Sequence, residues 1–378
     1  MQAHRELSDA RIVGAAQDQG RTLIFHIGDH KTGTTTIQHA FTTRLVRIGG
    51  VQPLYTASLS HNHLPQLFRA VLRDRNSPTA EKGRQVIAGL AAKIAASDAP
   101  ICVISAESFE GFDPAGLRRI LDEHFAGLFD RIRIIAYVRP HLQRFVSGYA
   151  ERTKIGILSG DMESFFQTCL AHDVFRFAPR FRKWRKVFGA DFVLRPFVRT
   201  ALIDGSLMTD FIRSAVGDVP FTVDPTDNQN ESLSLEDLLR VKYLHAQIKG
   251  RSEKFHHNYG WALTRMLGDM PRPETATRIR LHRSLAERAA EHFRPDARRL
   301  DEAFFPADRF LEQALSDDVA AACELPQLAT AEAMFSPSEM RSLDLTGRLI
   351  AEMLDNGKTP WAEHFHRRRL EHLHGAES

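Results

Sequence analysis

The sequence has few cysteines and no long apolar run. Its three cysteines, Cys102, Cys169 and Cys323, stand far apart in a chain of 378 residues and form no Cys-x-x-Cys spacing. This pattern is typical of a reducing compartment and argues against a disulfide framework and a zinc ribbon. No segment approaches the roughly 18 to 20 apolar residues that cross a bilayer. Residues 1–20 contain no apolar stretch of the signal-peptide type. We therefore expect a cytoplasmic protein without a transmembrane segment.

The chain also has no marked excess of charge of either sign. Fifty Lys and Arg residues balance 47 Asp and Glu residues, which gives a formal net charge of +3. This balance provides no electrostatic argument for a nucleic-acid partner. Hydrophobic residues make up 43% of the chain and charged residues 26%, the proportions of an ordinary globular protein.

Four short runs rich in β-branched residues predict buried strands at 23–27, 101–105, 132–138 and 192–194. Three of them are near-continuous apolar runs, which is typical of a parallel sheet covered on both faces. Apolar residues at helical spacing follow the strands: Ile37, Phe41, Leu45 and Ile48; Leu142, Phe145, Val146 and Tyr149; Val174, Phe177, Phe181, Trp184 and Phe188. The alternation predicts an α/β fold, in which ligands bind at the carboxyl ends of the strands.

From about Ser234 onwards the pattern is helical only. Ser234 and Asp237 form a capping signal for a helix that runs to about residue 249, and further helices are expected near 279–294 and 340–355. The apolar stripe of the last helix favours packing on its own domain over a partner-binding seam. We divide the chain into an extension (1–20), an α/β core (21–230), a helical C-terminal part of the same domain (231–335), and a final helix with a His/Arg-rich tail (336–378). No acidic or cysteine cluster accompanies the tail histidines, so we expect no metal site there.

Residues 23–37 combine a strand, a polar loop and an amphipathic helix. The loop reads Gly28-Asp-His-Lys-Thr-Gly-Thr-Thr35, and this layout directs backbone N–H groups and a helix N-terminus towards an anion. Gly33 would let the backbone approach the ligand, the threonines would donate to phosphate oxygens while capping the helix, and Lys31 would supply charge. A simple turn is the alternative interpretation. Thr34 stands where a Walker A loop has its lysine, so the loop is not of that type.

A second motif closes the third predicted strand. Arg139 ends the strand, and Arg144 and Ser147 lie on the helix that follows. The planar guanidinium of Arg139 can bind a phosphate through two N–H groups, and Ser147 can add a hydroxyl donor. A magnesium-dependent phosphotransferase would instead need an Asp near such a strand end, so arginine favours a metal-free phosphate. Arg144 is equally well explained as a surface residue of the helix.

Together the two motifs resemble the sulfotransferase superfamily, most of all its bacterial and carbohydrate-modifying branches. The loop is similar to the family's 5′-phosphosulfate-binding loop, and Arg139 with Ser147 matches its 3′-phosphate site. The likeness covers roughly residues 20–230. The segment 176–189 also looks like bacterial members, and its basic residues are interpreted as a solvated helix face.

The resemblance implies a P-loop-like three-layer fold, with a central parallel sheet flanked by helices and a helical C-terminal part. It also implies a sulfotransferase that uses 3′-phosphoadenosine 5′-phosphosulfate (PAPS) as its co-substrate and needs no metal. The residues that would bind PAPS are His30, Lys31, Thr32, Gly33, Thr34, Thr35, Arg139 and Ser147.

The implied chemistry is an in-line displacement at sulfur. Lys31 would stabilise the leaving oxygen, and a Glu or His side chain would take the proton of the acceptor. Glu107, just past a buried strand, and His63 are equal candidates for this base, with His61 behind them. The acceptor is unidentified; bacterial relatives suggest a saccharide or glycolipid. A P-loop-type phosphotransferase and a non-catalytic nucleotide-binding protein are the alternative functions.

Overall fold

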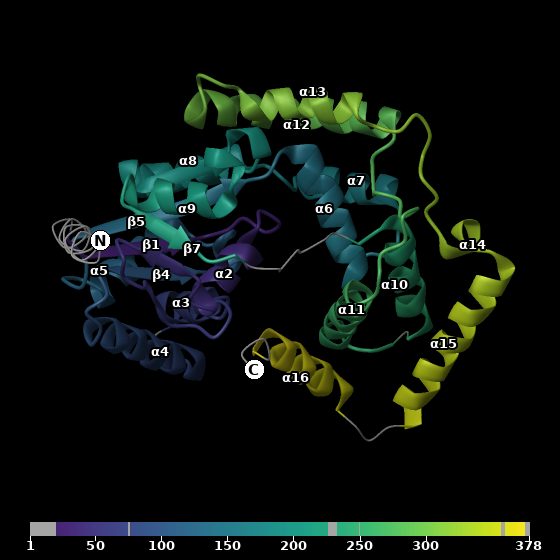
Figure 1. Ribbon diagram of the computed structural model, residues 1–378, viewed down its shortest axis with the longest axis horizontal. Helices are drawn as coiled ribbons and strands as arrows, with labels where there is room; N and C mark the ends of the chain where they lie inside the picture. The colour runs from purple at the N-terminus through teal and green to yellow at the C-terminus, as the bar shows by residue number, and fades with distance from the viewer. Residues whose placement is uncertain (1–19, 75, 226–232, 249, 357–359, 375–378) are drawn as a thin grey trace, which may run out of the picture. The chain divides into compact units, whose positions relative to one another are not determined.

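The computed structural model describes residues 20–74, 76–225, 233–248, 250–356 and 360–374 (Figure 1). The predicted extension at 1–20 therefore lies, except for Gly20, outside the described residues. The chain divides into two compact units. Unit 1 comprises Met1–Pro140, Arg176–Asn228 and Asp296–Leu311, and unit 2 comprises His141–Phe175, Gln229–Pro295 and Glu312–Ser378. This division differs from the predicted core at 21–230, because 141–175 belong to unit 2 and 296–311 join unit 1.

Unit 1 is built on a five-stranded parallel sheet. Its strands are β1 (Thr22–His26), β3 (Leu54–Tyr55), β4 (Ile101–Ser105), β5 (Arg131–Val138) and β6 (Phe192–Pro196), in the order β3-β4-β1-β5-β6. The four predicted strands and the α/β class are thus confirmed. The central strand β1 pairs along its full length with β4 and β5, so that His26 lies opposite Ser105 and Ile135. The carboxyl ends of these three strands consequently meet at one edge of the sheet.

Helices cover both faces of this sheet. On one face, α2 (Thr34–Thr42) and α9 (Leu207–Val216) pack a common core that contains Ile24, Ile37, Phe41, Val103, Ile135 and Phe211. On the other face, the rings of Phe25 and Phe109 lie 4.9 Å apart, and α8 (Ala178–Phe188) stacks Phe181 and Trp184 on Phe192. Unit 1 also contains α3 (Leu64–Arg73), α4 (Pro78–Ala95) and α5 (Pro114–His124). Burial on both faces explains the near-continuous apolar runs of the strands.

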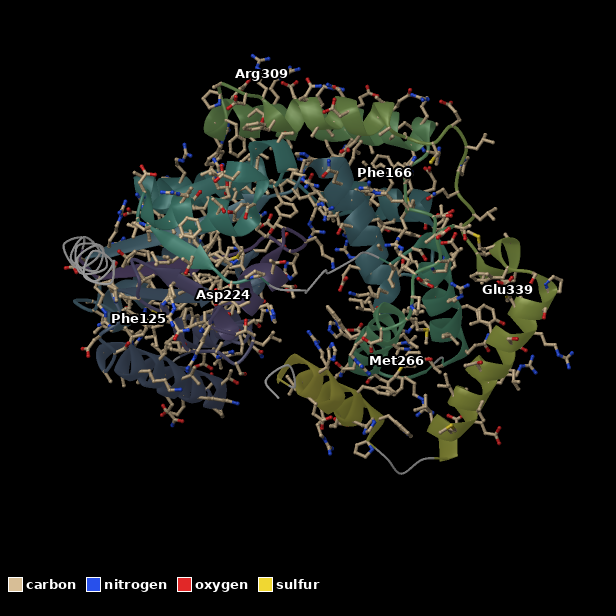
Figure 2. The ribbon with its side chains drawn as sticks, in the orientation of Figure 1. Phe125, Phe166, Asp224, Met266, Arg309 and Glu339 are labelled. Carbon is tan, nitrogen blue, oxygen red and sulfur yellow. The ribbon has the colours of Figure 1, made fainter. Side chains whose placement is uncertain are left out.

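A small antiparallel ribbon replaces the last turn of one predicted helix. Helix α2 ends at Thr42, and β2 (Val46–Ile48) pairs with β7 (Phe221–Val223). The prediction of Leu45 and Ile48 on the helix is therefore wrong. Arg44 adopts a left-handed φ of 59°, which ends the helix, and the backbone N–H of Asp224 (labelled in Figure 2) donates to the Leu45 carbonyl at 2.9 Å.

Short 3-10 turns complete the connections in unit 1: η1 (Glu107–Phe109), η2 (Gly189–Asp191), η3 (Arg199–Ala201) and η4 (Ile203–Gly205). Several helices begin at a Ser or Asp whose side chain accepts a backbone N–H, as Ser77 does for α4, Asp113 for α5 and Ser206 for α9. Each such cap contributes about 1 kcal/mol. Phe125, labelled in Figure 2, follows α5 and is buried.

Unit 2 is helical in its described part. It contains α6 (His141–Lys154), α7 (Met162–Ala171), α10 (Leu235–Gln247), α11 (Glu253–Gly268), α14 (Ala331–Met334), α15 (Pro337–Asn356) and α16 (Trp361–His374). Helices α12 (Arg283–Phe304) and α13 (Phe310–Ala320) each contribute residues to both units. Ser234 caps α10 by accepting the Asp237 N–H at 3.0 Å, as predicted.

The stripe of α15 packs within unit 2, as the sequence favoured. Leu343, Ile350 and Leu354 contact a cluster that includes Leu244 and Ile248 at the end of α10. None of the helices in the described ranges is long and apolar enough to cross a membrane.

Candidate functional site

The loop between β1 and α2 is anchored to β5 before it turns into the helix. The N–H of Asp29 donates to the carbonyl of Tyr137 at 3.1 Å, and the N–H of Tyr137 donates to the carbonyl of Gly28 at 2.7 Å. Gly28, Lys31 and Gly33 have φ values of 93°, 66° and 77°. A lysine rarely adopts this left-handed conformation, and residues held in it are concentrated at functional sites.

The threonines of the loop support it from within. Thr32 and Thr34 are buried, and their hydroxyls donate to the carbonyl oxygen of Asp29 at 2.6 and 3.1 Å, whereas Thr35 is exposed. The N-cap residue of α2 is Gly33, which has no side-chain cap, so the predicted capping by threonine is wrong. A Cβ atom on Gly33 would lie 2.3 Å from a methyl carbon of Leu207, which gives this glycine a packing role.

Asp29 forms a buried ion pair inside the loop. Its side chain is 1% exposed, and both of its carboxylate oxygens accept from the guanidinium of Arg180 on α8, with Nη1 2.7 Å from Oδ1. Arg180 also donates to the carbonyl of Glu110 at 3.1 Å. The interpretation of the basic residues of 176–189 as a solvated face is therefore wrong for Arg180, because this side chain turns inward to a buried carboxylate.

His30 is held by a second carboxylate from outside the loop. Its Nδ1 atom lies 2.5 Å from Oε2 of Glu110, and its backbone N–H donates to the same oxygen at 3.3 Å. The His30 side chain is 44% exposed. Glu110, which follows η1, and Arg180 thus both fix the first half of the loop. Neither residue was among the predicted site residues.

Arg139 lies directly beside the loop. Its Nη1 atom donates to the carbonyl oxygen of Lys31 at 3.0 Å, and its guanidinium carbon is 5.9 Å from the centre of the Phe197 ring. Lys31 and Arg139 are both half-buried. The structure therefore brings the basic residues of the two sequence motifs, which are 108 positions apart, to one place at the carboxyl edge of the sheet.

The two candidate bases lie on segments that contact each other. Glu107 opens η1, is half-buried, and has its Cα 3.1 Å from where a Cβ on Gly28 would stand. Within the described part of the chain, the Glu107 carboxylate makes no hydrogen bond or ion pair. His63 is exposed at the start of α3, where partial burial and the charge of Lys82 lower its pKa. The hydroxyl of Ser108 donates to the carbonyl of Asn62 at 3.0 Å, which joins the two segments.

His61 is structural. Its Nδ1 accepts the N–H of Ser105 at 3.2 Å, so its Nε2 carries the proton and donates to the hydroxyl of Thr56 at 3.0 Å. Burial, together with the charge of His63, lowers the pKa of His61 to about 3. His26 is fully buried, lies 2.8 Å from the Ser105 hydroxyl through Nδ1, and has a pKa lowered by burial to about 3. Both histidines are neutral and brace the edge of β1 and β4 beneath the loop.

Ser147 and Arg144 lie on α6, in unit 2. Arg144 is buried, with its guanidinium carbon 5.0 Å from the centre of the Phe175 ring, so its interpretation as a surface residue is wrong. Arg139 belongs to unit 1, and its pairing with Ser147 around one phosphate stays a prediction.

Shallow grooves lie in unit 2, one lined by Glu287, Glu291, Arg294 and Ser316, and one around 274–280; neither contains a predicted site residue. In the described ranges, no group of three or more His, Cys, Asp or Glu side chains is arranged to hold a metal ion. In comparisons with protein-family models, curated proteins and solved structures, the chain matches none of them.

Proposed function

We propose that the protein is a sulfotransferase that moves a sulfuryl group from PAPS to a hydroxyl or amine of an acceptor. A saccharide or glycolipid acceptor and a cytoplasmic location belong to the same proposal. The observation that carries it is the contact between Arg139 and the Lys31 carbonyl at 3.0 Å. The cationic side chain of one motif contacts the backbone of the lysine of the other motif, where a parallel sheet presents the N-terminus of α2, and such a place favours a ligand with several phosphate charges.

The order of the elements supports a P-loop-like arrangement. The loop with its Gly28 and Gly33 follows the central strand β1 and leads directly into α2, which is the strand–loop–helix layout of phosphate-binding loops. The first N–H groups of α2 have no partner within the helix and are the natural donors to a phosphate oxygen. Lys31 adds a point charge in the same loop.

In the proposed reaction the acceptor oxygen or nitrogen attacks sulfur. A bond forms between the acceptor and sulfur while the bond from sulfur to the bridging oxygen of the 5′-phosphate breaks. Lys31 would neutralise the charge that develops on the leaving oxygen. The acceptor's proton would pass to Glu107 or His63, and 3′-phosphoadenosine 5′-phosphate (PAP) would leave. Glu107 has the better position, because its backbone contacts Gly28 of the loop.

The proposal is tested by calorimetric titration with PAP in the absence of divalent metal. We expect wild-type protein to bind with a micromolar dissociation constant, about −8 kcal/mol. Arg139→Ala should weaken binding about 10- to 100-fold, because a hydrogen bond to a charged group contributes about 1.5–3 kcal/mol. Arg131→Ala is the matched control, since Arg131 opens the same strand at the opposite end and should leave binding unchanged.

Three results would argue against the proposal or a part of it. Wild-type protein that binds ATP with Mg²⁺ but not PAP would instead favour a P-loop-type phosphotransferase. Equal effects of Arg139→Ala and Arg131→Ala would remove Arg139 from the site. Binding of PAP without product formation from PAPS and any acceptor would favour the non-catalytic alternative.

A further inference from the structure

The buried carboxylate of Asp29 sits inside a loop that is proposed to bind an anion. It lies between Gly28 and His30, and its carbonyl oxygen accepts the hydroxyls of Thr32 and Thr34. A negative charge at this position opposes the binding of a phosphate, because charges interact strongly where little water separates them. The loop therefore needs a partner that offsets this charge.

Arg180 is the partner that offsets this charge. It approaches Asp29 with two nitrogen atoms in the bidentate geometry that arginine forms with carboxylates. The ring of Phe181 lies 4.2 Å from its guanidinium carbon, and the Glu110 carbonyl accepts a further hydrogen bond at 3.1 Å. The arginine is consequently fixed before any ligand binds.

The helix that carries Arg180 is itself anchored. The carboxylate of Asp296 accepts the N–H groups of Phe177 and Ala178 at 2.8 and 3.2 Å, at the first turn of α8. Burial alone would lower the pKa of Arg180, but the charges and hydrogen bonds of Asp29, with Glu110 and Asp296, outweigh it and raise the pKa. The guanidinium thus remains charged in its partly buried position.

Stability alone does not account for this pair. A buried ion pair loses most of its attraction to the cost of removing both charges from water, and well-packed apolar residues are often as stable. The placement of the pair inside the loop points to a role in the site.

We propose that Arg180 is a positioning residue of the PAPS site, which cancels the charge of Asp29 and holds the first half of the loop in its anion-binding conformation. This inference rests on the proposed function, since the anion is taken to be the donor nucleotide. It adds a residue that neither sequence motif contains, and it explains why an acidic residue is tolerated in the loop.

The test compares Arg180→Gln, Asp29→Asn and the double variant by calorimetric titration with PAP. Arg180→Gln removes the cation that faces both carboxylate oxygens of Asp29, and we expect PAP affinity to fall at least about tenfold. The double variant removes both charges and keeps two hydrogen-bonding side chains, and it should bind within about threefold of wild type. Arg182→Gln changes an exposed arginine on the same helix and should bind as wild type does.

A purely structural role makes a different prediction. Both single substitutions would then weaken binding alike, in step with their unfolding temperatures, and the double variant would recover nothing. Near-wild-type affinity of Arg180→Gln, or a folded double variant that binds as poorly as Arg180→Gln, would overturn the inference. If Arg180→Gln does not fold, the double variant is compared with Asp29→Asn and with wild type. A folded double variant that binds PAP weakly would then overturn the inference.

Failure of the proposed function can be distinguished from failure of the inference on Arg180. Wild-type protein that does not bind PAP sinks the sulfotransferase proposal, and the same variants are then titrated with ATP and Mg²⁺ and with inorganic sulfate. Recovery of affinity in the double variant with either probe supports the role of Arg180 at an anion loop. A wild type that binds none of these anions overturns both proposals.

Discussion

Acidification is expected to destabilise unit 1 through two buried histidines. His26 and His61 have pKa values lowered to about 3 by burial, whereas an unfolded histidine titrates near 6.5. Between pH 3 and pH 6.5, the two histidines bind protons in the unfolded chain but stay neutral in the folded protein. The stability they contribute is therefore complete above pH 6.5 and is lost as the pH falls from 6.5 towards 3.

The size of the effect follows from the two pKa values. Each histidine gives a slope that approaches about 1.4 kcal/mol per pH unit, or roughly 2 to 3 kcal/mol between pH 6 and pH 4. The two together cost roughly 5 kcal/mol over that range, which is comparable with the whole stability of many domains, about 5–15 kcal/mol. Unit 1 should therefore approach its unfolding midpoint near pH 4.

The assay is urea unfolding at several pH values, followed by tryptophan fluorescence. Trp184 is fully buried in unit 1, and Trp261→Phe with Trp361→Phe would leave it as the reporter. His61→Gln keeps an acceptor for Ser105 and a donor for Thr56 but cannot titrate, so the loss of stability between pH 6 and pH 4 should be smaller than in the parent by about half of the part that the two histidines contribute. Because carboxylates titrate equally in both proteins, an unchanged pH dependence in His61→Gln would refute the reasoning.

Two further predictions concern the glycines and the thiols. Gly33→Ala should lower the free energy of unfolding by about 1–2 kcal/mol or more, because φ is 77° and a Cβ would lie 2.3 Å from a neighbouring methyl group. Gly89→Ala should raise the free energy of unfolding by about 0.5–1 kcal/mol, because Gly89 lies within α4 and a Cβ there would have no atom within 4 Å. Urea unfolding measures both, and the same sign for the two changes would contradict the geometry. Burial raises the pKa of Cys102 to about 12 and of Cys169 to about 11. In a thiol titration with an aromatic disulfide, the folded protein should therefore react quickly only at Cys323, and rapid reaction of all three thiols before denaturation would argue against this core.

The sequence predicted the longer strands better than the short ones. The runs that became β1, β4 and β5 are near-continuously apolar, as strands covered on both faces are, so hydrophobicity alone identified them. The strands β2, β3 and β7 have only two or three residues, which is too short for a periodic signal. In the same way, the apolar spacing of Leu45 and Ile48 suited a helix, although Leu45 precedes β2 and Ile48 ends it.

Residues of the candidate site were predictable where they belong to a recognisable sequence motif. Lys31 lies in the loop that follows β1 and Arg139 directly follows β5, so the pairing of these two parallel strands brings the two segments together. Arg180 and Glu110 were missed because their roles depend on tertiary contacts. The segment 176–189 has several basic residues at similar spacing, and only the packing of α8 selects the one that turns inward to Asp29.

Because Asp296 caps α8, the support of the β1–α2 loop depends on a residue that is synthesised much later than the loop itself. Asp296 leaves the ribosome more than a hundred residues after Arg180, a delay of roughly 6 to 23 s at about 5–20 residues per second. Until then the helix that supports Asp29 lacks the carboxylate that holds its first turn. A nascent chain of 230 residues therefore carries the whole sheet and both motifs, yet the helix that supports its β1–α2 loop lacks a capping segment that has not been made.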